Sequence, residues 1–154
     1  MELYLLRHGE AGGAAGVADE QRALTPRGIE SLRQVLALAR EKGAAPAAVF
    51  TSPLLRAVQT ARLAEEILGG GPPVVLNALA LARWPDELWD EVSAHTGRQP
   101  MLLTGHNPLL ADMVEWLTGQ PAAMPTAALA AIEIPEPGIR PRGSLRWLVT
   151  LAAP

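Results

Sequence analysis

Apolar residues occur along the chain in short runs that alternate with longer amphipathic stretches. Runs of the length of buried strands occupy residues 1–6, 48–51, 74–76 and 100–104. Stretches with helical spacing predict helices over residues 26–42, 53–68, 85–95 and 109–117. The first two helices each follow a Ser/Thr–Pro pair and stop at glycine, which are start and stop signals. In the second helix we expect Leu55, Val58 and Ile67 to face the core.

The end of the chain has a different pattern from the rest. Two strand-like runs, residues 127–134 and 144–151, are joined by a loop. In the second run Leu145, Trp147, Val149 and Leu151 alternate, as on one face of a half-buried strand.

The order of these elements predicts the fold class. Strands that alternate with helices form a mainly parallel sheet covered on both faces. We expect an α/β fold, a three-layer α/β/α sandwich with an antiparallel pair at one side of the sheet. Residues 1–154 are expected to form a single domain, with a Gly/Ala-rich loop at residues 11–23.

Composition narrows the classes of function. The chain is 49% hydrophobic and 19% charged, which is typical of a globular protein. A net charge of −3 offers no basic face for nucleic acid, and the lack of cysteine excludes disulfides and thiolate chemistry. Without a leader-like start or a membrane-length apolar stretch, we expect a cytoplasmic protein with no membrane partner.

Polar residues that a core does not need follow three of the predicted strands. Residues 7–10 follow the first strand, residues 51–56 the second and residues 105–108 the fourth. The carboxyl ends of parallel strands lie at the same edge of a sheet, so these segments are expected to converge. Two of the three histidines, His8 and His106, fall at this edge.

These residue types indicate a phosphate site. The Arg7 guanidinium suits phosphate oxygens, and Arg56 falls in the first turn of a helix, where free N–H groups favour anions. His8 can attack, bind metal or move a proton. The ligand spacings of a metal centre and a Walker-type glycine loop are missing from the sequence, so we expect no metal and no cofactor.

Some of these residues have simpler interpretations. Ser52 is interpreted as a helix cap, because no partner base is specified for a nucleophile. His106 could likewise serve only to start a helix. Of the four tryptophans, Trp84 is the candidate for a pocket wall and the others for packing.

The motifs resemble those of a known family. The residues Leu6-Arg7-His8-Gly9-Glu10 resemble the signature of the histidine phosphatase superfamily, which has the phosphoglycerate-mutase-like fold. Residues 52–61 and 105–108 resemble its later motifs in order and approximate spacing. Arg22 and residues 24–28 are similar to the SixA-type phosphohistidine phosphatases, a short branch, and the resemblance covers essentially the whole chain.

The resemblance implies a role for each motif residue. His8, neutral, would attack phosphorus and become transiently phosphorylated. The catalytic set that it implies is Arg7, His8, Arg56 and His106. The substrate-binding candidates are Gly9, Glu10, Arg22 and Asn107.

One departure from the family pattern bears on the substrate. Relatives that act on alcohol phosphates carry a carboxylic acid after the third strand, and the aligned position here is Ala78. The absence of this acid should slow the reaction least when the leaving group is an imidazole, whose conjugate acid has a pKa of roughly 6.5. Asp86, Glu87 or Glu10 remains an alternative acid.

We therefore expect a metal-independent phosphatase that acts on phosphohistidine of a partner protein and binds phosphate-like anions. One alternative is a phosphomonoesterase of the same superfamily that acts on small phosphate esters. Another is a catalytically weak module that binds phosphate or phosphoproteins. The oligomeric state stays open.

Overall fold

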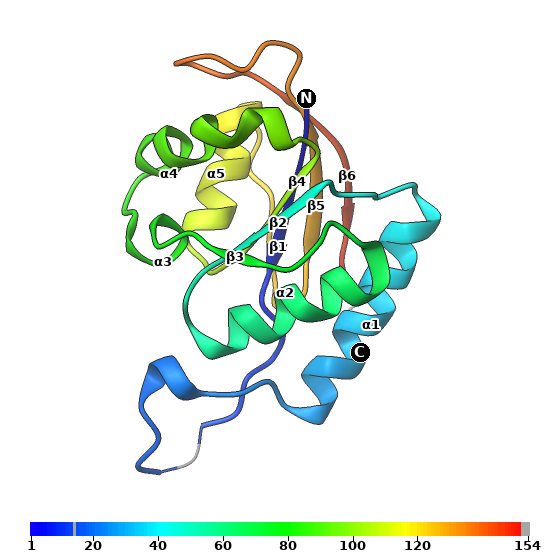
Figure 1. Cartoon of the computed structure of the whole chain (residues 1–154), viewed down its shortest axis with the longest axis vertical. Coiled ribbons are helices and arrows are strands. Elements are labelled where there is room, and N and C mark those ends of the chain that lie inside the picture. The colour runs from blue at the N-terminus through cyan, green and yellow to red at the C-terminus, as the bar shows by residue number, and fades with distance from the viewer. Residues whose placement is uncertain (14, 152–154) are drawn as a thin grey trace.

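A computed structural model describes residues 1–13 and 15–151 of the chain. Within these residues, six strands form one sheet in the order β3-β2-β4-β1-β5-β6 (Figure 1). The strands are β1 (Glu2–Arg7), β2 (Ala48–Thr51), β3 (Val74–Val75), β4 (Met101–Gly105), β5 (Leu129–Glu133) and β6 (Ser144–Val149). Ala14 of the predicted loop and residues 152–154 of the predicted domain lie outside the described residues.

Helices cover both faces of this sheet. The α-helices are α1 (Pro26–Glu41), α2 (Leu55–Leu68), α3 (Ala78–Leu81), α4 (Pro85–Val92) and α5 (Leu109–Thr118). Two 3₁₀ turns, η1 (Asp19–Gln21) and η2 (Ser93–Arg98), complete the helical segments of the described chain. Helices α1 and α2 lie on one face and α3, α4 and α5 on the other (Figure 1).

The directions of the strands confirm the predicted architecture. Strands β3, β2, β4 and β1 are parallel, β5 is antiparallel to β1, and β6 is antiparallel to β5. The fold is therefore a three-layer α/β/α sandwich with a mainly parallel sheet and an antiparallel pair at one side. No helix of the described residues has the length and apolar character needed to cross a membrane.

Strand β1 is the centre of both cores. Leu3 and Leu5 pack into the cluster beneath α4 and α5, whereas Tyr4 and Leu6 pack into the cluster beneath α1 and α2. Because alternate side chains enter opposite faces, all four are buried. The chain that leaves this strand is therefore held in place from both sides.

The start and stop of α1 agree with the sequence signals. Thr25 caps the helix, because its Oγ1 accepts a hydrogen bond of 2.9 Å from the Gly28 N–H. Pro26 occupies the first turn, and Gly43, which follows the last turn, has a φ of +91°. The helix therefore begins and ends where the sequence predicts.

The prediction for α2 is wrong in its start and for two core-facing residues, Leu55 and Val58, whereas Ile67 packs against the core as predicted. Ser52 Oγ accepts a hydrogen bond from Leu54 N–H, so Ser52 shapes the turn before the helix, and α2 begins at Leu55. Leu55 is exposed, and Val58 and Ile67 are only partly buried. The buried face consists of Arg56, Ala57, Thr60, Ala61 and Ala64. Small side chains on this face let the helix lie close to the sheet.

Three further elements differ from the sequence expectations. The register of β5 and β6 shifts between Ala131 and Ile132, so Leu145 packs on the α5 side and Trp147 on the α1 side. The predicted single face of β6 is therefore divided between the two cores. Helix α4 ends at Val92 and continues as η2, and the short helix α3 was not predicted.

The register of the central strands aligns their carboxyl ends. Arg7 pairs with Gly105 across β1 and β4, and Thr51 pairs with Thr104 across β2 and β4. Thr104 Oγ1 also donates hydrogen bonds to Thr51 Oγ1 and to the Ala57 carbonyl, which ties α2 to these two strands. The three polar segments thus begin side by side, as predicted.

A close contact between α1 and the segment after β1 generates the first prediction. A Cβ atom added at Gly28 would overlap the Glu10 carbonyl oxygen. We expect Gly28→Ala to destabilise the protein by about 2 kcal/mol through overpacking. Alanine normally stabilises a helix relative to glycine by roughly 0.5–1 kcal/mol. A lower free energy of unfolding in Gly28→Ala would therefore indicate the overlap with the Glu10 carbonyl.

The free energy of unfolding, from denaturant titration, checks this prediction. The matched control is Gly97→Ala, because a Cβ at Gly97 meets nothing within 4 Å. The control is expected to unfold at the wild-type denaturant concentration or higher. Equal effects of the two substitutions would contradict the proposed contact.

Candidate active site

His8 follows β1 directly and is fixed by its backbone and its ring. Its N–H donates to the Gly105 carbonyl at 3.0 Å, which continues the β1–β4 ladder past the end of β1. Its ring Nδ1 lies 2.7 Å from the Gly9 carbonyl oxygen. Since a carbonyl can only accept, Nδ1 carries the proton and Nε2 keeps a free lone pair. The buried His8 residue therefore has Nε2 as its unprotonated ring nitrogen.

Gly9 lets the chain pass close to α1 and α2. Its N–H donates to Thr60 Oγ1 at 3.2 Å, and a Cβ at this position would lie 2.7 Å from Leu32 Cδ1. Glycine is therefore the residue that allows this approach. Its role is to position His8, and it does so through its backbone.

His106 follows β4 and faces His8. The two ring centroids lie 5.1 Å apart. Its Nε2 lies 2.7 Å from Ser52 Oγ, which also accepts a hydrogen bond from Leu54 N–H. Its Nδ1 is buried and has no hydrogen-bond partner in the described chain. His106 therefore has one ring nitrogen available to a ligand.

Arg7 points to the same region from the end of β1. Its Nη1 donates to the Met124 carbonyl at 3.1 Å, whereas its Nε is buried without a partner among the described residues. Asn107 Nδ2 donates to the same carbonyl at 2.8 Å, and its Oδ1 accepts from Ala111 N–H in α5. Asn107 thus fixes the loop that Arg7 binds. Burial lowers the pKa of Arg7, which is expected of a desolvated cation without an anion beside it.

Arg56 and Arg22 are joined by a residue that the sequence analysis missed. Arg56, nearly buried at the start of α2, donates to the Asp19 backbone carbonyl at 2.8 Å and to Asp19 Oδ2 at 3.2 Å. Arg22 donates to Asp19 Oδ1 at 2.9 Å. The Asp19 carboxylate therefore bridges the two guanidinium groups. The spacing of Asp19 and Arg22, three residues apart, was the signal available in the sequence.

Glu10 lies outside this cluster. Its side chain is exposed, and its Oε1 accepts a hydrogen bond of 2.9 Å from Thr25 Oγ1 at the start of α1. The structure therefore places Glu10 with the cap of α1, although it was predicted to bind substrate. Arg7, His8, Arg56 and His106 are brought together, with Arg22 at the rim.

Both histidines are held in the neutral form. Burial lowers the pKa of His8 below its ordinary value of 6.5, and the charges of Arg56 and Arg7 lower it further against the opposing Gly9 hydrogen bond. Burial, with the neighbouring His8 and Arg56, lowers the pKa of His106 to about 4. At neutral pH the His8 Nε2 lone pair is therefore available for attack.

The hydrogen bonds from Arg22 and Arg56 lower the pKa of Asp19 below its ordinary value of 3.8. Asp19 is therefore ionised across the neutral range. It can balance the charge of the arginines, but it has no proton to donate at neutral pH.

A hollow of about 380 Å³ opens beside His106. Its lining comes from the start of α2, the α3 region and the start of α5: Leu54, Leu79, Ala80, Ala82, Arg83, His106, Asn107, Pro108 and Leu109. None of these described residues is a carboxylic acid. Ala78 lies in a neighbouring hollow, and the exposed Trp84, the candidate for a pocket wall, is not part of the wall beside His106.

The acids that the sequence left open lie elsewhere. Glu87 accepts a hydrogen bond from Arg83 N–H and lines the same hollow as Ala78. Asp86 is exposed and accepts a hydrogen bond from Glu87 N–H in the first turn of α4. Neither residue lines the His106 hollow.

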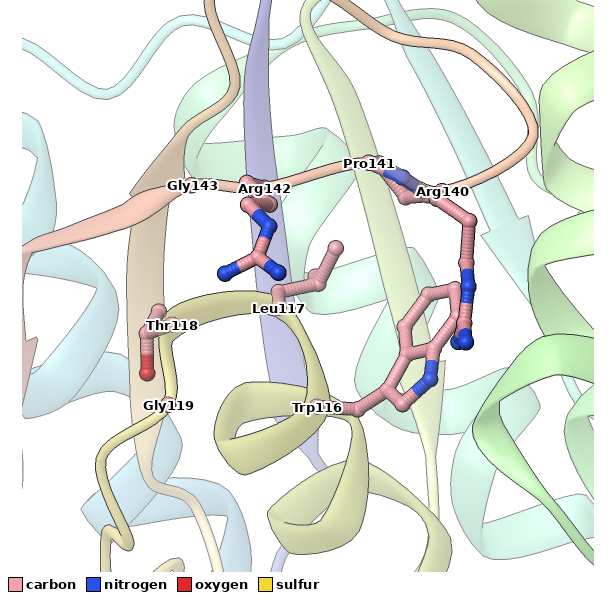
Figure 2. Close-up of a pocket in the computed structure, with 8 residues that line it drawn as sticks. All are labelled: Trp116, Leu117, Thr118, Gly119, Arg140, Pro141, Arg142 and Gly143. Atoms are coloured by element: carbon pink, nitrogen blue, oxygen red, sulfur yellow. The ribbon is translucent and has the colours of Figure 1, made fainter.

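A separate hollow of about 330 Å³ lies at the other end of the sheet (Figure 2). Arg140 and Arg142 face it from the segment before β6, and Trp116 from α5. Arg142 lies over the carboxyl end of α5, where a cation is favourable to the helix. In the part of the chain described by the structure, no group of His, Asp or Glu residues could hold a metal ion.

Comparisons with known proteins match this arrangement. The histidine phosphatase superfamily (branch 1) matches residues 3–84. An uncharacterized protein of Picosynechococcus sp. is 33% identical, over 75% of this chain and 70% of its own length.

Solved structures of SixA proteins are also similar. A protein histidine phosphatase SixA complexed with tungstate is 27% identical, with a TM-score of 0.86 and 97% of both chains covered. SixA from Agrobacterium tumefaciens is 25% identical, with a TM-score of 0.84 and the same coverage. The chain belongs to the histidine phosphatase superfamily, in its SixA-type branch, and its activity is that of a phosphatase.

Proposed function

We propose that this protein hydrolyses phosphohistidine on a partner protein through a phosphohistidine intermediate on His8. The observation that carries the proposal is the hydrogen bond between His8 Nδ1 and the Gly9 carbonyl. It leaves the Nε2 lone pair free beside the buried Arg56 and the partly buried Arg7 and His106. A neutral nucleophile among cations is suited to a phosphoryl dianion.

The first step transfers the phosphoryl group to His8. His8 Nε2 attacks phosphorus, and the P–N bond of the substrate breaks as the Nε2–P bond forms. Phosphoryl transfer needs positioning and positive charge around the equatorial oxygens. Arg7 Nε and His106 Nδ1 are the two buried side-chain nitrogens without partners in the described chain, and in the proposed mechanism they would donate to those oxygens. Arg56 and Arg22, which both donate hydrogen bonds to the Asp19 carboxylate, would add positive charge near the phosphoryl group.

The leaving group decides which substrates this site can serve. A phosphohistidine protonated on its other ring nitrogen releases neutral imidazole, so no proton has to be supplied. An alcohol leaving group would need an acid. The described hollow beside His106 has no carboxylic acid in its lining, and Asp19 is held ionised. These features support a P–N substrate over an alcohol phosphate.

The second step releases phosphate. Phospho-His8 carries phosphorus on Nε2 and a proton on Nδ1, so its ring is cationic, and the Gly9 carbonyl stabilises this charge. Water attacks phosphorus, the Nε2–P bond breaks, and its electron pair returns to Nε2. The protons of the water leave with the phosphate, and His8 returns to its neutral form.

The proposed nucleophile is tested by labelling. Exposure to ³²P-phosphoramidate followed by rapid alkaline quench is expected to give an alkali-stable, acid-labile label on the wild-type protein. His8→Ala should lose this label, because the lone pair is removed. The control is His95→Gln, since His95 packs beside Phe50, outside the site. Label that persists in His8→Ala would assign the nucleophile elsewhere.

The leaving-group argument predicts a preference among substrates. We expect kcat/KM for a phosphohistidine protein to exceed that for alkyl phosphates by about 100-fold or more, the size of one missing general acid. Among aryl phosphates, kcat/KM should fall steeply as the pKa of the leaving phenol rises. Steady-state kinetics over such a panel checks both expectations. A preference for alkyl phosphates, or a flat dependence, would favour phosphomonoesterase activity.

The shifted histidines predict a pH dependence. Because His8 must be neutral to attack, activity is lost only as pH falls through its lowered pKa, so the acidic limb lies below pH 6.5. NMR titration of the ring resonances of His8 and His106 gives the pKa of each histidine directly, with the resonances assigned from single variants. This separates the protonation of His8 from the protonation of the substrate phosphate. His106 should titrate near pH 4. A midpoint at or above pH 6.5 for His8 would contradict its proposed environment.

A further inference from the structure

Large apolar side chains are exposed in one region next to the candidate active site. Leu81 is 75% exposed and Trp84 is 63% exposed, and the edge-strand residues Val74 and Val75 are also exposed. We call these four residues the α3 surface. Single exposed apolar residues are ordinary, but a cluster beside a functional site is typical of an interaction surface.

The α3 surface continues into the hollow beside His106. Val75 and Leu81 line a hollow of about 560 Å³, which also includes Ala82. Ala82 in turn lines the hollow that contains His106. A protein that brings a phosphorylated side chain to His8 would therefore cover this surface as well.

Acidic residues form one wall of the larger hollow. Glu87 and Glu91, both on α4, line it together with the apolar residues. Strand β3 pairs with β2 alone and forms one edge of the sheet, and α3 lies next to it (Figure 1). This combination suits a partner with apolar contacts and a basic residue nearby.

We propose that the α3 surface docks the phosphohistidine-bearing protein, through apolar residues of the partner beside its phosphohistidine and a basic residue that meets Glu87 and Glu91. The proposal rests on the proposed function and adds to it where the partner binds. Substrates too small to reach the α3 surface gain nothing from it. Recognition of the partner and cleavage of the P–N bond are therefore separable in this protein.

The experiment compares two kinds of P–N substrate. One is a small basic protein phosphorylated on histidine with potassium phosphoramidate, and the other is phosphoimidazole. In Leu81→Ser and Trp84→Ser we expect kcat/KM for the protein to fall about tenfold, mainly through KM. With phosphoimidazole the same variants should stay within about twofold of wild type.

The matched control is Ile139→Ser, an exposed apolar residue beyond the opposite end of the sheet. It should leave kcat/KM for both substrates unchanged.

The acidic wall is tested with two phosphohistidine proteins, one basic and one acidic. We expect wild type to prefer the basic protein, and both Glu91→Gln and added salt should weaken that preference. Thermal melting of every variant confirms that each one folds.

The outcomes separate this proposal from the proposed function. Equal losses on both substrates in Leu81→Ser and Trp84→Ser would overturn docking, because the residues would then shape the pocket itself. Unchanged kinetics on the phosphohistidine protein would also overturn it. A wild type that cleaves neither P–N substrate would contradict the proposed function, and docking with it.

Discussion

The alignment of β1, β2 and β4 at their carboxyl ends is the constraint on which the candidate site depends. Arg7 pairs with Gly105 and Thr51 with Thr104, so His8 is level with His106, and Ser52 lies one residue earlier, level with Gly105. A slip of one residue would turn every side chain of a strand to the other face. Register is strongly fixed here, because Leu3 and Leu5 enter one core while Tyr4 and Leu6 enter the other. The two cores therefore set the distance between the two histidines.

Charge around the histidines follows from the same geometry. Arg7, Arg22 and Arg56 carry three positive charges, and Asp19 removes one. The remaining two match the charge of a phosphoryl group, about −1.5 to −2 at pH 7. Positive surroundings and burial also keep His8 neutral, so the same groups that would attract the substrate would preserve the proposed nucleophile. Asp19 keeps two of the arginines ordered before a substrate arrives.

The sequence predicted what depends on local pattern and strand direction. His8, Arg56 and His106 were expected to converge, because each follows a strand and parallel strands end at one edge. Asp19 was missed because its partner Arg56 lies 37 residues away, and the hydrogen bond exists only after the loop folds back onto α2.

Tertiary packing explains the remaining differences from the sequence predictions. The buried face of α2 was misjudged because close packing selects small residues such as Ala57 and Ala61, and apolar spacing alone does not show this. The bulge opposite Ala131 and Ile132 inverts the alternation of β6, an effect that arises from pairing between strands. The secondary-structure propensity of single residues and the spacing of apolar residues do not report on these contacts between helix and sheet or between strands.

Chemistry and recognition place different demands on this fold. The proposed transfer between two imidazoles needs no acid, so the hollow beside His106, which has no carboxylic acid in its described lining, could serve it. By the same reasoning, contacts with the phosphoryl group alone cannot distinguish one phosphohistidine from another. Discrimination between substrates has to come from contacts that only the correct partner makes. In this molecule the surface next to His106 offers such contacts in the apolar residues Leu81 and Trp84 and the acidic side of α4.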